Sequence, residues 1–147
     1  MEIYFGNKDR SIELYAVNKN VVEQKYCYNN VFNIMSCDDE VLTKIAKGEW
    51  KIAYCFFKVF DKQNIYVRHC CFLDALNNEM IDATATLLSS FKERQKPEYH
   101  LIHAFDYKEY MNALNTYHRE PALTKYLYDK TETLRAEMIA EGLIAID

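Results

Sequence analysis

Apolar residues in the first third of the chain recur at the three- and four-residue spacing of an amphipathic helix. In the segment 27–36 they stand at Cys27, Val31, Ile34 and Met35, so one face of this helix would be buried. Asp38 would cap a second short helix that ends before Gly48. Earlier in the chain, residues 3–5 predict a strand, and residues 12–17 predict a short helix or a strand.

From Trp50 onward the pattern changes to the aromatic and β-branched residues typical of strands. Turn residues at 61–64 indicate a hairpin. A second turn at 76–79 is rich in asparagine, which tolerates left-handed backbone geometry. Residues 87–97 read as a polar connection or a short helix. The predicted strands are 50–60, 65–73, 80–85 and 99–105.

The last forty or so residues predict two helices. Asp106 would cap the first, which runs to about His118, and Pro121 would open the second. One buried face of the second helix would carry Leu123, Leu127, Leu134, Met138 and Ile139. The order of elements predicts an α+β fold in one domain, 1–147: early helices, an antiparallel meander, then two helices packed on it.

Composition favours a globular protein and narrows its partners. Half of the residues are hydrophobic, and glycine and proline are scarce, which indicates regular structure with short connections. The net charge of −4 disfavours binding to nucleic acid, which is itself negatively charged and favours a basic surface. No apolar stretch approaches the roughly 18 residues of a membrane span, and the segment 1–5 lacks the features of a signal peptide. We therefore expect a cytoplasmic protein that binds neither nucleic acid nor membranes.

Cysteine and histidine spacing gives no sign of a metal centre. The five cysteines are Cys27, Cys37, Cys55, Cys70 and Cys71. Their number is odd and no Cys-x-x-Cys pair occurs, so neither a disulfide framework nor zinc ligation is expected. Cys55 and Cys70 are expected in the core. His100 and His103 would face opposite sides of a strand, which disfavours a shared ion. We expect no metal and no cofactor.

Three residues in separate segments carry complementary chemistry. Cys27 stands where a helix begins, His69 lies in a predicted strand, and Asp82 follows the second turn. A thiol, an imidazole and a carboxylate can act as nucleophile, base and orienting group. The start of a helix is also a position that favours the reactive thiolate form.

The register of the sheet decides whether His69 and Asp82 meet. A turn centred on residues 77–78 would place both on one face, but about 13 Å apart along the strand. A turn centred on residues 75–76 would place Asp82 directly opposite His69, and strong twist or a bulge could also close the gap. Asp74 is the alternative orienting group.

The segments 27–31, 69–72 and 81–84 resemble the transglutaminase-like and papain-like cysteine enzyme superfamily, including its small bacterial and phage members. The resemblance covers about residues 22–90 in the right order. It implies a catalytic triad in which Cys27 is the nucleophile, His69 the base and Asp82 the orienting group.

The same resemblance supplies two candidates for oxyanion or substrate binding. Asn30 completes a Cys-x-x-Asn start, and Gln24 is similar to an oxyanion-hole glutamine at a shorter spacing. The sequence departs from the family pattern in that Ala83 replaces the common proline and no glycine precedes Cys27.

The expected function is cysteine-dependent acyl transfer on an amide or ester, in a peptidase, amidase, deamidase or transglutaminase acting on a protein or peptide. Water or an amine would resolve the thioester. The alternative is a catalytically inactive domain of the same fold, possibly phage-encoded, that binds or inhibits another protein through its tyrosine-rich C-terminal half. Substrate and oligomeric state stay open.

Overall fold

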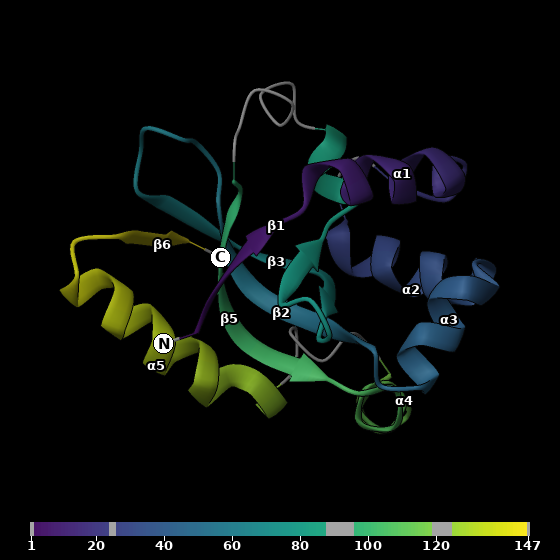
Figure 1. The fold of residues 1–147 in the computed structure, drawn as a ribbon. Helices are drawn as coiled ribbons and strands as arrows, with labels where there is room; N and C mark the ends of the chain where they lie inside the picture. Colours follow the sequence, from purple (N-terminus) through teal and green to yellow (C-terminus); the bar gives the residue numbers. More distant parts are fainter. Residues whose placement is uncertain (1, 24–25, 88–95, 119–124, 147) are drawn as a thin grey trace.

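Strands that close on themselves form the centre of the molecule (Figure 1). The computed structural model describes residues 2–23, 26–87, 96–118 and 125–146. Within them, the strands follow the order β2-β5-β1-β4-β3, and β3 pairs again with β2 to close a five-stranded barrel, while β6 adds to β3. The strands are β1 (Ile3–Gly6), β2 (Trp50–Lys58), β3 (Ile65–Asp74), β4 (Glu79–Ile81), β5 (Glu98–Phe105) and β6 (Ile144–Ile146).

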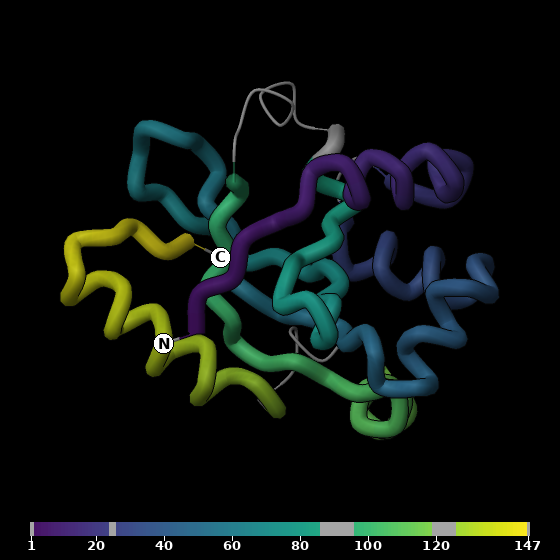
Figure 2. Tube along the Cα trace, viewed as in Figure 1, coloured from purple at the N-terminus to yellow at the C-terminus, as the bar shows by residue number. Residues whose placement is uncertain are grey.

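Helices cover the barrel on two sides. Figures 1 and 2 show α1, α2 and α3 together on one side, and α5 with β6 on the other. The described α-helices are α1 (Lys8–Asn18), α2 (Cys27–Cys37), α3 (Asp39–Ala46), α4 (Tyr107–Tyr117) and α5 (Tyr128–Ala140). Two short 3-10 helices are η1 (Thr84–Leu87) and η4 (Lys125–Leu127).

Helix ends follow the capping residues that the sequence indicates. The side chain of Asp38 accepts from the backbone of Glu40 and Val41 at the start of α3, and Asp106 accepts from Glu109 at the start of α4. Gly48 follows α3 with a φ of +76°, which only glycine adopts without strain. The prediction of two central helices and of α4 is confirmed.

The predicted α+β class is confirmed, and β2, β3 and β4 pair antiparallel in chain order as predicted, but β5 pairs with β2 and β1 and not with β4, so the sheet closes into a barrel. β1 pairs parallel with β4 and antiparallel with β5, so the N-terminal strand completes the barrel. β3 and β6 are also parallel. The predicted third strand ends at Ile81, because the side chain of Asp82 accepts from the backbone of Ala85 in η1, which begins at Thr84. β6 was not predicted.

The last helix differs from its prediction at one position. The proposed start at Pro121 and the apolar Leu123 lie outside the described residues. Leu134 and Met138 are buried on α5 as expected. Ile139 is wrong as a core residue, since its side chain is 56% exposed on the opposite face of the helix.

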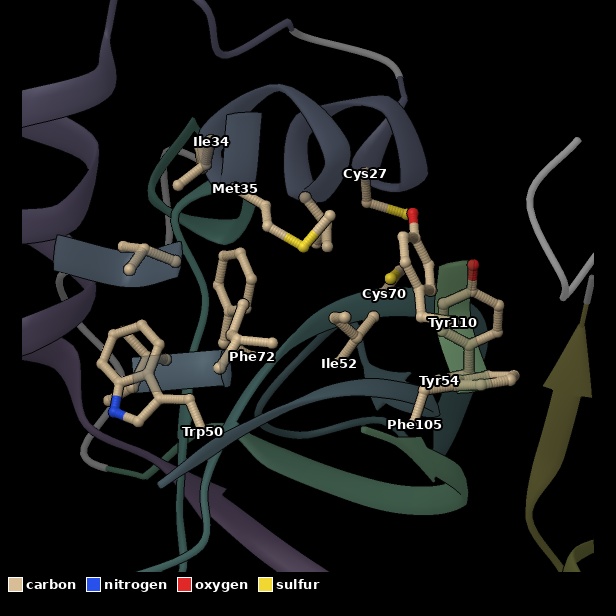
Figure 3. Close-up of a cluster of buried hydrophobic side chains, with 14 of the residues drawn as sticks. Cys27, Ile34, Met35, Trp50, Ile52, Tyr54, Cys70, Phe72, Phe105 and Tyr110 are labelled. Carbon is tan, nitrogen blue, oxygen red and sulfur yellow. The ribbon is translucent and has the colours of Figure 1, made fainter. Parts of the chain in front are cut away.

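Alternate residues of the strands build two cores. One set fills the barrel: Ala53, Cys55, Phe57, Cys71, Leu73, Met80 and Tyr99. The other set faces the helices and packs on α2, as Figure 3 shows for Ile52, Tyr54, Cys70 and Phe72. His69 shares the strand face of Cys71 and points into the barrel, whereas Cys70 points toward α2. The site therefore lies where the two cores meet.

Candidate active site

Cys27 is the first residue of α2. The N-cap residue Tyr26 provides no side-chain cap, and the first turn holds no acidic residue. The first N–H groups of a helix have no acceptor within the helix, and together with the helix dipole they favour negative charge beside them. The sequence therefore sets the thiol at an electropositive helix end, with 9% of its residue surface exposed.

His69 and Asp82 are joined by a buried hydrogen bond. Nε2 of His69 donates to Oδ2 of Asp82 at 2.7 Å, and both residues are buried. Phe72 pairs with Ile81 across β3 and β4, so the turn is centred on residues 76–77. This register lies midway between the two alternatives raised by the sequence. Asp82 consequently sits two positions from His69 on the same face, a diagonal offset that long side chains can span.

The thiol of Cys27 meets the second side of the His69 ring. The side chain of Cys27 lies near enough to His69 to raise the pKa of the ring, and because Asp82 occupies Nε2, Nδ1 is the ring nitrogen that remains for the sulfur. Burial lowers the pKa of His69, but the charge of Asp82 and the neighbouring Cys27 raise it well above its usual value of 6.5. The structure thus brings together all three predicted triad residues.

The place where α2 meets β3 explains this contact. Along one edge of β3, β4 pairs with residues 72–74 and β6 with residues 65–67. The stretch 68–71 lies between these two pairings, and α2 packs on β3. Figure 3 shows Cys27 reaching from α2 toward Cys70 in this stretch. The helix start therefore approaches the strand beside His69.

Backbone contacts fix the position of Asp82. Its Oδ1 accepts from the backbone of Ala85, and its own N–H donates to Oγ of Ser11 at 2.9 Å. Ser11 Oγ in turn donates to the carbonyl of Asn7 at 2.7 Å. Ser11 could not be identified from the sequence. A serine among the apolar residues of a helix gives no sign that it contacts the backbone at the end of β4.

Tyr99 is a second residue that the sequence did not single out. Its hydroxyl donates to Oδ2 of Asp82 at 2.7 Å, on the oxygen that also accepts from His69. The alternation of its strand indicates a buried face, but only closure of the barrel brings β5 to the end of β4.

Asp74 does not orient His69. It forms a 2.6 Å ion pair with Arg10 and accepts from the backbone and side chain of Asn77. Burial raises the pKa of Asp74, but these hydrogen bonds and the arginine lower it to a value below the ordinary one. Asp74 thus stabilises the β3–β4 turn, and Asp82 is the carboxylate that hydrogen-bonds to His69.

Asn30 holds the segment before Cys27. Its buried Nδ2 donates to the carbonyl of Glu23 at 2.9 Å and to Oγ1 of Thr84 at 2.7 Å, and its Oδ1 accepts from the backbone of Glu23. Both amide hydrogens are thereby committed within the protein. We assign Asn30 a positioning role in place of direct substrate binding. Gln24, the other predicted oxyanion residue, lies outside the described residues.

The remaining cysteines and histidines are not members of the proposed triad. Cys55, Cys70 and Cys71 are buried, and Cys37 is exposed. His100 bonds to Glu98. Among the residues described, no group of three histidine, cysteine or acidic side chains is arranged to hold a metal ion. In the same part of the chain, no helix has the length and apolar character needed to cross a membrane.

Two cavities lie apart from the triad. A cavity of about 560 Å³ runs along α4, lined by Asp106, Lys108, Glu109, Asn112, Ala113, Thr116, Tyr117 and Tyr126. A smaller one of about 190 Å³ lies between α1 and α3 beside Trp50. We give the connected triad more weight than cavity size, because chemistry requires the reacting groups to touch.

No protein-family model, curated protein or solved structure matches this chain.

Proposed function

We propose that this chain is a cysteine-nucleophile acyl-transfer enzyme with a Cys27-His69-Asp82 triad. The observation that carries the proposal is the position of His69, which donates to Asp82 at 2.7 Å and lies near enough to Cys27 for that residue to raise the pKa of the ring. A nucleophile, a base and an oriented base partner in contact are the signature of covalent catalysis. The helix that bears the thiol and the strands that bear its partners are also consistent with a papain-like or transglutaminase-like core.

In the proposed reaction, the proton of the Cys27 thiol passes to Nδ1 of His69. The sulfur attacks the carbonyl carbon of an amide or ester and forms a tetrahedral oxyanion. Backbone N–H groups at the start of α2 stabilise this oxyanion, because they have no acceptor within the helix. Collapse of the intermediate breaks the bond to the leaving group, which takes the proton from His69. A thioester on Cys27 remains.

Resolution of the thioester repeats these steps in reverse. Water or an amine gives a proton to His69 and attacks the thioester carbon, and the proton then returns to the sulfur. Water gives hydrolysis or deamidation, and an amine gives cross-linking. Asp82 stabilises the protonated ring throughout, which agrees with the raised pKa of His69. The acyl donor is proposed to be a protein or peptide.

The experiment compares two thiols of opposite exposure. Cys37 is exposed, whereas Cys27 is 9% exposed, so access alone predicts that Cys37 reacts first with iodoacetamide. If the triad activates Cys27, that residue will react faster at pH 7, by about tenfold or more. Peptide-resolved mass spectrometry of brief labelling measures both rates in the same sample.

Matched variants separate activation from access. His69→Gln should bring the rate at Cys27 down to that at Cys37 or below, while Cys37→Ser should leave the rate at Cys27 unchanged. Preferential labelling of Cys37 in the unaltered protein would contradict the enzyme proposal.

Burial of the thiol favours a second candidate, an inactive domain of the same fold that binds another protein. A peptide reaches Cys27 only if neighbouring side chains move, since little of the residue is exposed. In this case Cys27 reacts no faster than Cys37, and Cys27→Ser retains the biological effect of the protein. The enzyme proposal requires the opposite result in both measurements.

A further inference from the structure

Tyr99 extends the triad by one residue inside the barrel. It is fully buried on β5, and its hydroxyl donates to Oδ2 of Asp82 at 2.7 Å. The same oxygen accepts from Nε2 of His69 at 2.7 Å. One carboxylate oxygen therefore serves both rings, while Oδ1 of Asp82 accepts from the backbone of Ala85.

The packing around Tyr99 holds this arrangement in place. The centroid of the Phe57 ring lies 5.0 Å from the centroid of the Tyr99 ring and 5.2 Å from that of the His69 ring. A buried tyrosine ring flanked by an aromatic neighbour has little rotational freedom. Burial and the charge of Asp82 also raise the pKa of Tyr99 well above its usual value, so the phenol keeps its proton and stays a donor.

We propose that Tyr99 is a positioning residue of the active site, which fixes Oδ2 of Asp82 and moderates the pull of this oxygen on the proton of His69. The inference rests on the proposed function for its catalytic meaning. A hydrogen bond to a carboxylate spreads its negative charge. Without the phenol, Oδ2 would attract the proton on His69 more strongly. This oxygen would also keep only one of its two hydrogen bonds, the one from His69.

Among the described residues, the titratable groups around His69 come from several elements. Asp82 follows β4, Cys27 begins α2, and Tyr99 lies on β5. Cys55, whose thiol contacts the carbonyl of His69 from β2, and Cys71 on β3 lie on the same side of the barrel wall. Asp82 is the acidic residue among them. The hydroxyl of Tyr99 donates to Oδ2 of Asp82, and it therefore affects how strongly this oxygen holds the proton of His69.

The test is a titration of His69 by NMR in protein labelled at histidine, with the His69 signal assigned from His69→Gln. Tyr99→Phe removes only the hydroxyl and keeps the ring. We expect the titration midpoint of His69 to rise by about 0.5 to 1 pH unit in Tyr99→Phe. Asp82→Asn should lower the midpoint, since it removes the charge itself.

Tyr66→Phe is the matched control. Tyr66 is also buried, and its hydroxyl donates to a carboxylate, that of Glu98. This variant should leave the midpoint of His69 where it is in the unaltered protein. A dispersed amide spectrum confirms that each variant is folded.

An unchanged or lowered midpoint in folded Tyr99→Phe would overturn the inference, and so would an equal rise in Tyr66→Phe. The titration needs no substrate and no turnover, so its outcome is separate from that of the labelling experiment. Slow labelling of Cys27 would remove the proposed function, while an unchanged His69 midpoint would remove the role of Tyr99 alone.

Discussion

A single carboxylate, that of Asp82, sets the charge around His69. Burial lowers the pKa of His69, and Asp82 together with Cys27 more than reverses this effect. Because the pKa in the folded protein is raised above 6.5, protonation of His69 stabilises the fold. This contribution is complete below about pH 6.5 and is lost as the pH rises through the raised pKa.

We therefore predict a pH-dependent loss of stability in Asp82→Asn. Its free energy of unfolding should be lower than that of the unaltered protein at pH 6, and the difference should narrow as the pH rises. Each pH unit by which Asp82 raises the pKa of His69 corresponds to about 1.4 kcal/mol. Urea unfolding at pH 6 to 10 measures the difference, and two parallel curves would contradict the prediction.

Asp74→Asn is the control for this experiment. Burial raises the pKa of Asp74, but the hydrogen bonds from Asn77 and Arg10 outweigh this effect, so the pKa lies below its ordinary value. Its contribution to stability is therefore lost only as the pH falls into the acidic range. Above pH 6 this variant should give a constant difference from the unaltered protein.

Residue chemistry was the part of the site most open to prediction. Cys27, His69 and Asp82 were identified from residue type, order and local context, and the structure places them in contact. Ser11 and Tyr99 could not be found in this way. Serine and tyrosine are common in helices and strands, and their contacts with Asp82 depend on which strands become neighbours in space.

At the scale of the element, the start of α2 depends on a clamp built by Asn30. The buried amide joins the backbone of Glu23 to the hydroxyl of Thr84, which begins η1. It thus connects the segment before Cys27 with the segment after Asp82. The distance between thiol and base depends on this connection.

Asn30→Ala should therefore weaken both the fold and the site. We expect it to lower the free energy of unfolding by about 1 to 3 kcal/mol, because the buried amide of Asn30 and its hydrogen bonds to Glu23 and Thr84 are lost. The labelling rate of Cys27 should fall with it. Asn33→Ala is the control, since its amide only reaches the carbonyl of Val21 at 3.5 Å. Equal effects of both substitutions would argue against a specific clamp.

Elements were predicted best where a local signal marks them. The caps Asp38 and Asp106 gave the helix starts at α3 and α4. The β3–β4 register was left open, because a shift of one residue in the turn centre moves the paired residues by two positions. Ion pairing of Asp74 with Arg10, far away in sequence, helps to fix that turn.

At the scale of the whole molecule, β1 and α1 connect the N-terminal part of the chain to the site. β1 inserts between β4 and β5, and Ser11 on α1 accepts from the backbone of Asp82. Nothing in the local pattern of residues 3–6 selects these partners, so barrel closure could not be predicted from the sequence.

Ser11→Ala tests this long-range connection. We expect a loss of about 1 to 3 kcal/mol in unfolding free energy, because the buried N–H of Asp82 loses its acceptor, while the carbonyl of Asn7 keeps the backbone N–H of residue 11. The amide hydrogen of Asp82 should also exchange faster with solvent. Ser36→Ala removes an exposed hydroxyl from α2 and should be nearly neutral. An unaltered exchange rate at Asp82 would contradict the expected coupling.

The placement of β1 has a consequence for the newborn chain. Phe5 pairs with Glu79 in β4 and with Glu98 in β5. The barrel therefore cannot close until the chain has left the ribosome as far as β5. Contacts so distant in sequence form late, since a long loop must first be ordered. Cys27 emerges well before Asp82 and Tyr99, and until they arrive it is an ordinary thiol. In the proposed enzyme, Cys27 therefore becomes activated only after the strands that bring His69, Asp82 and Tyr99 together have been synthesised.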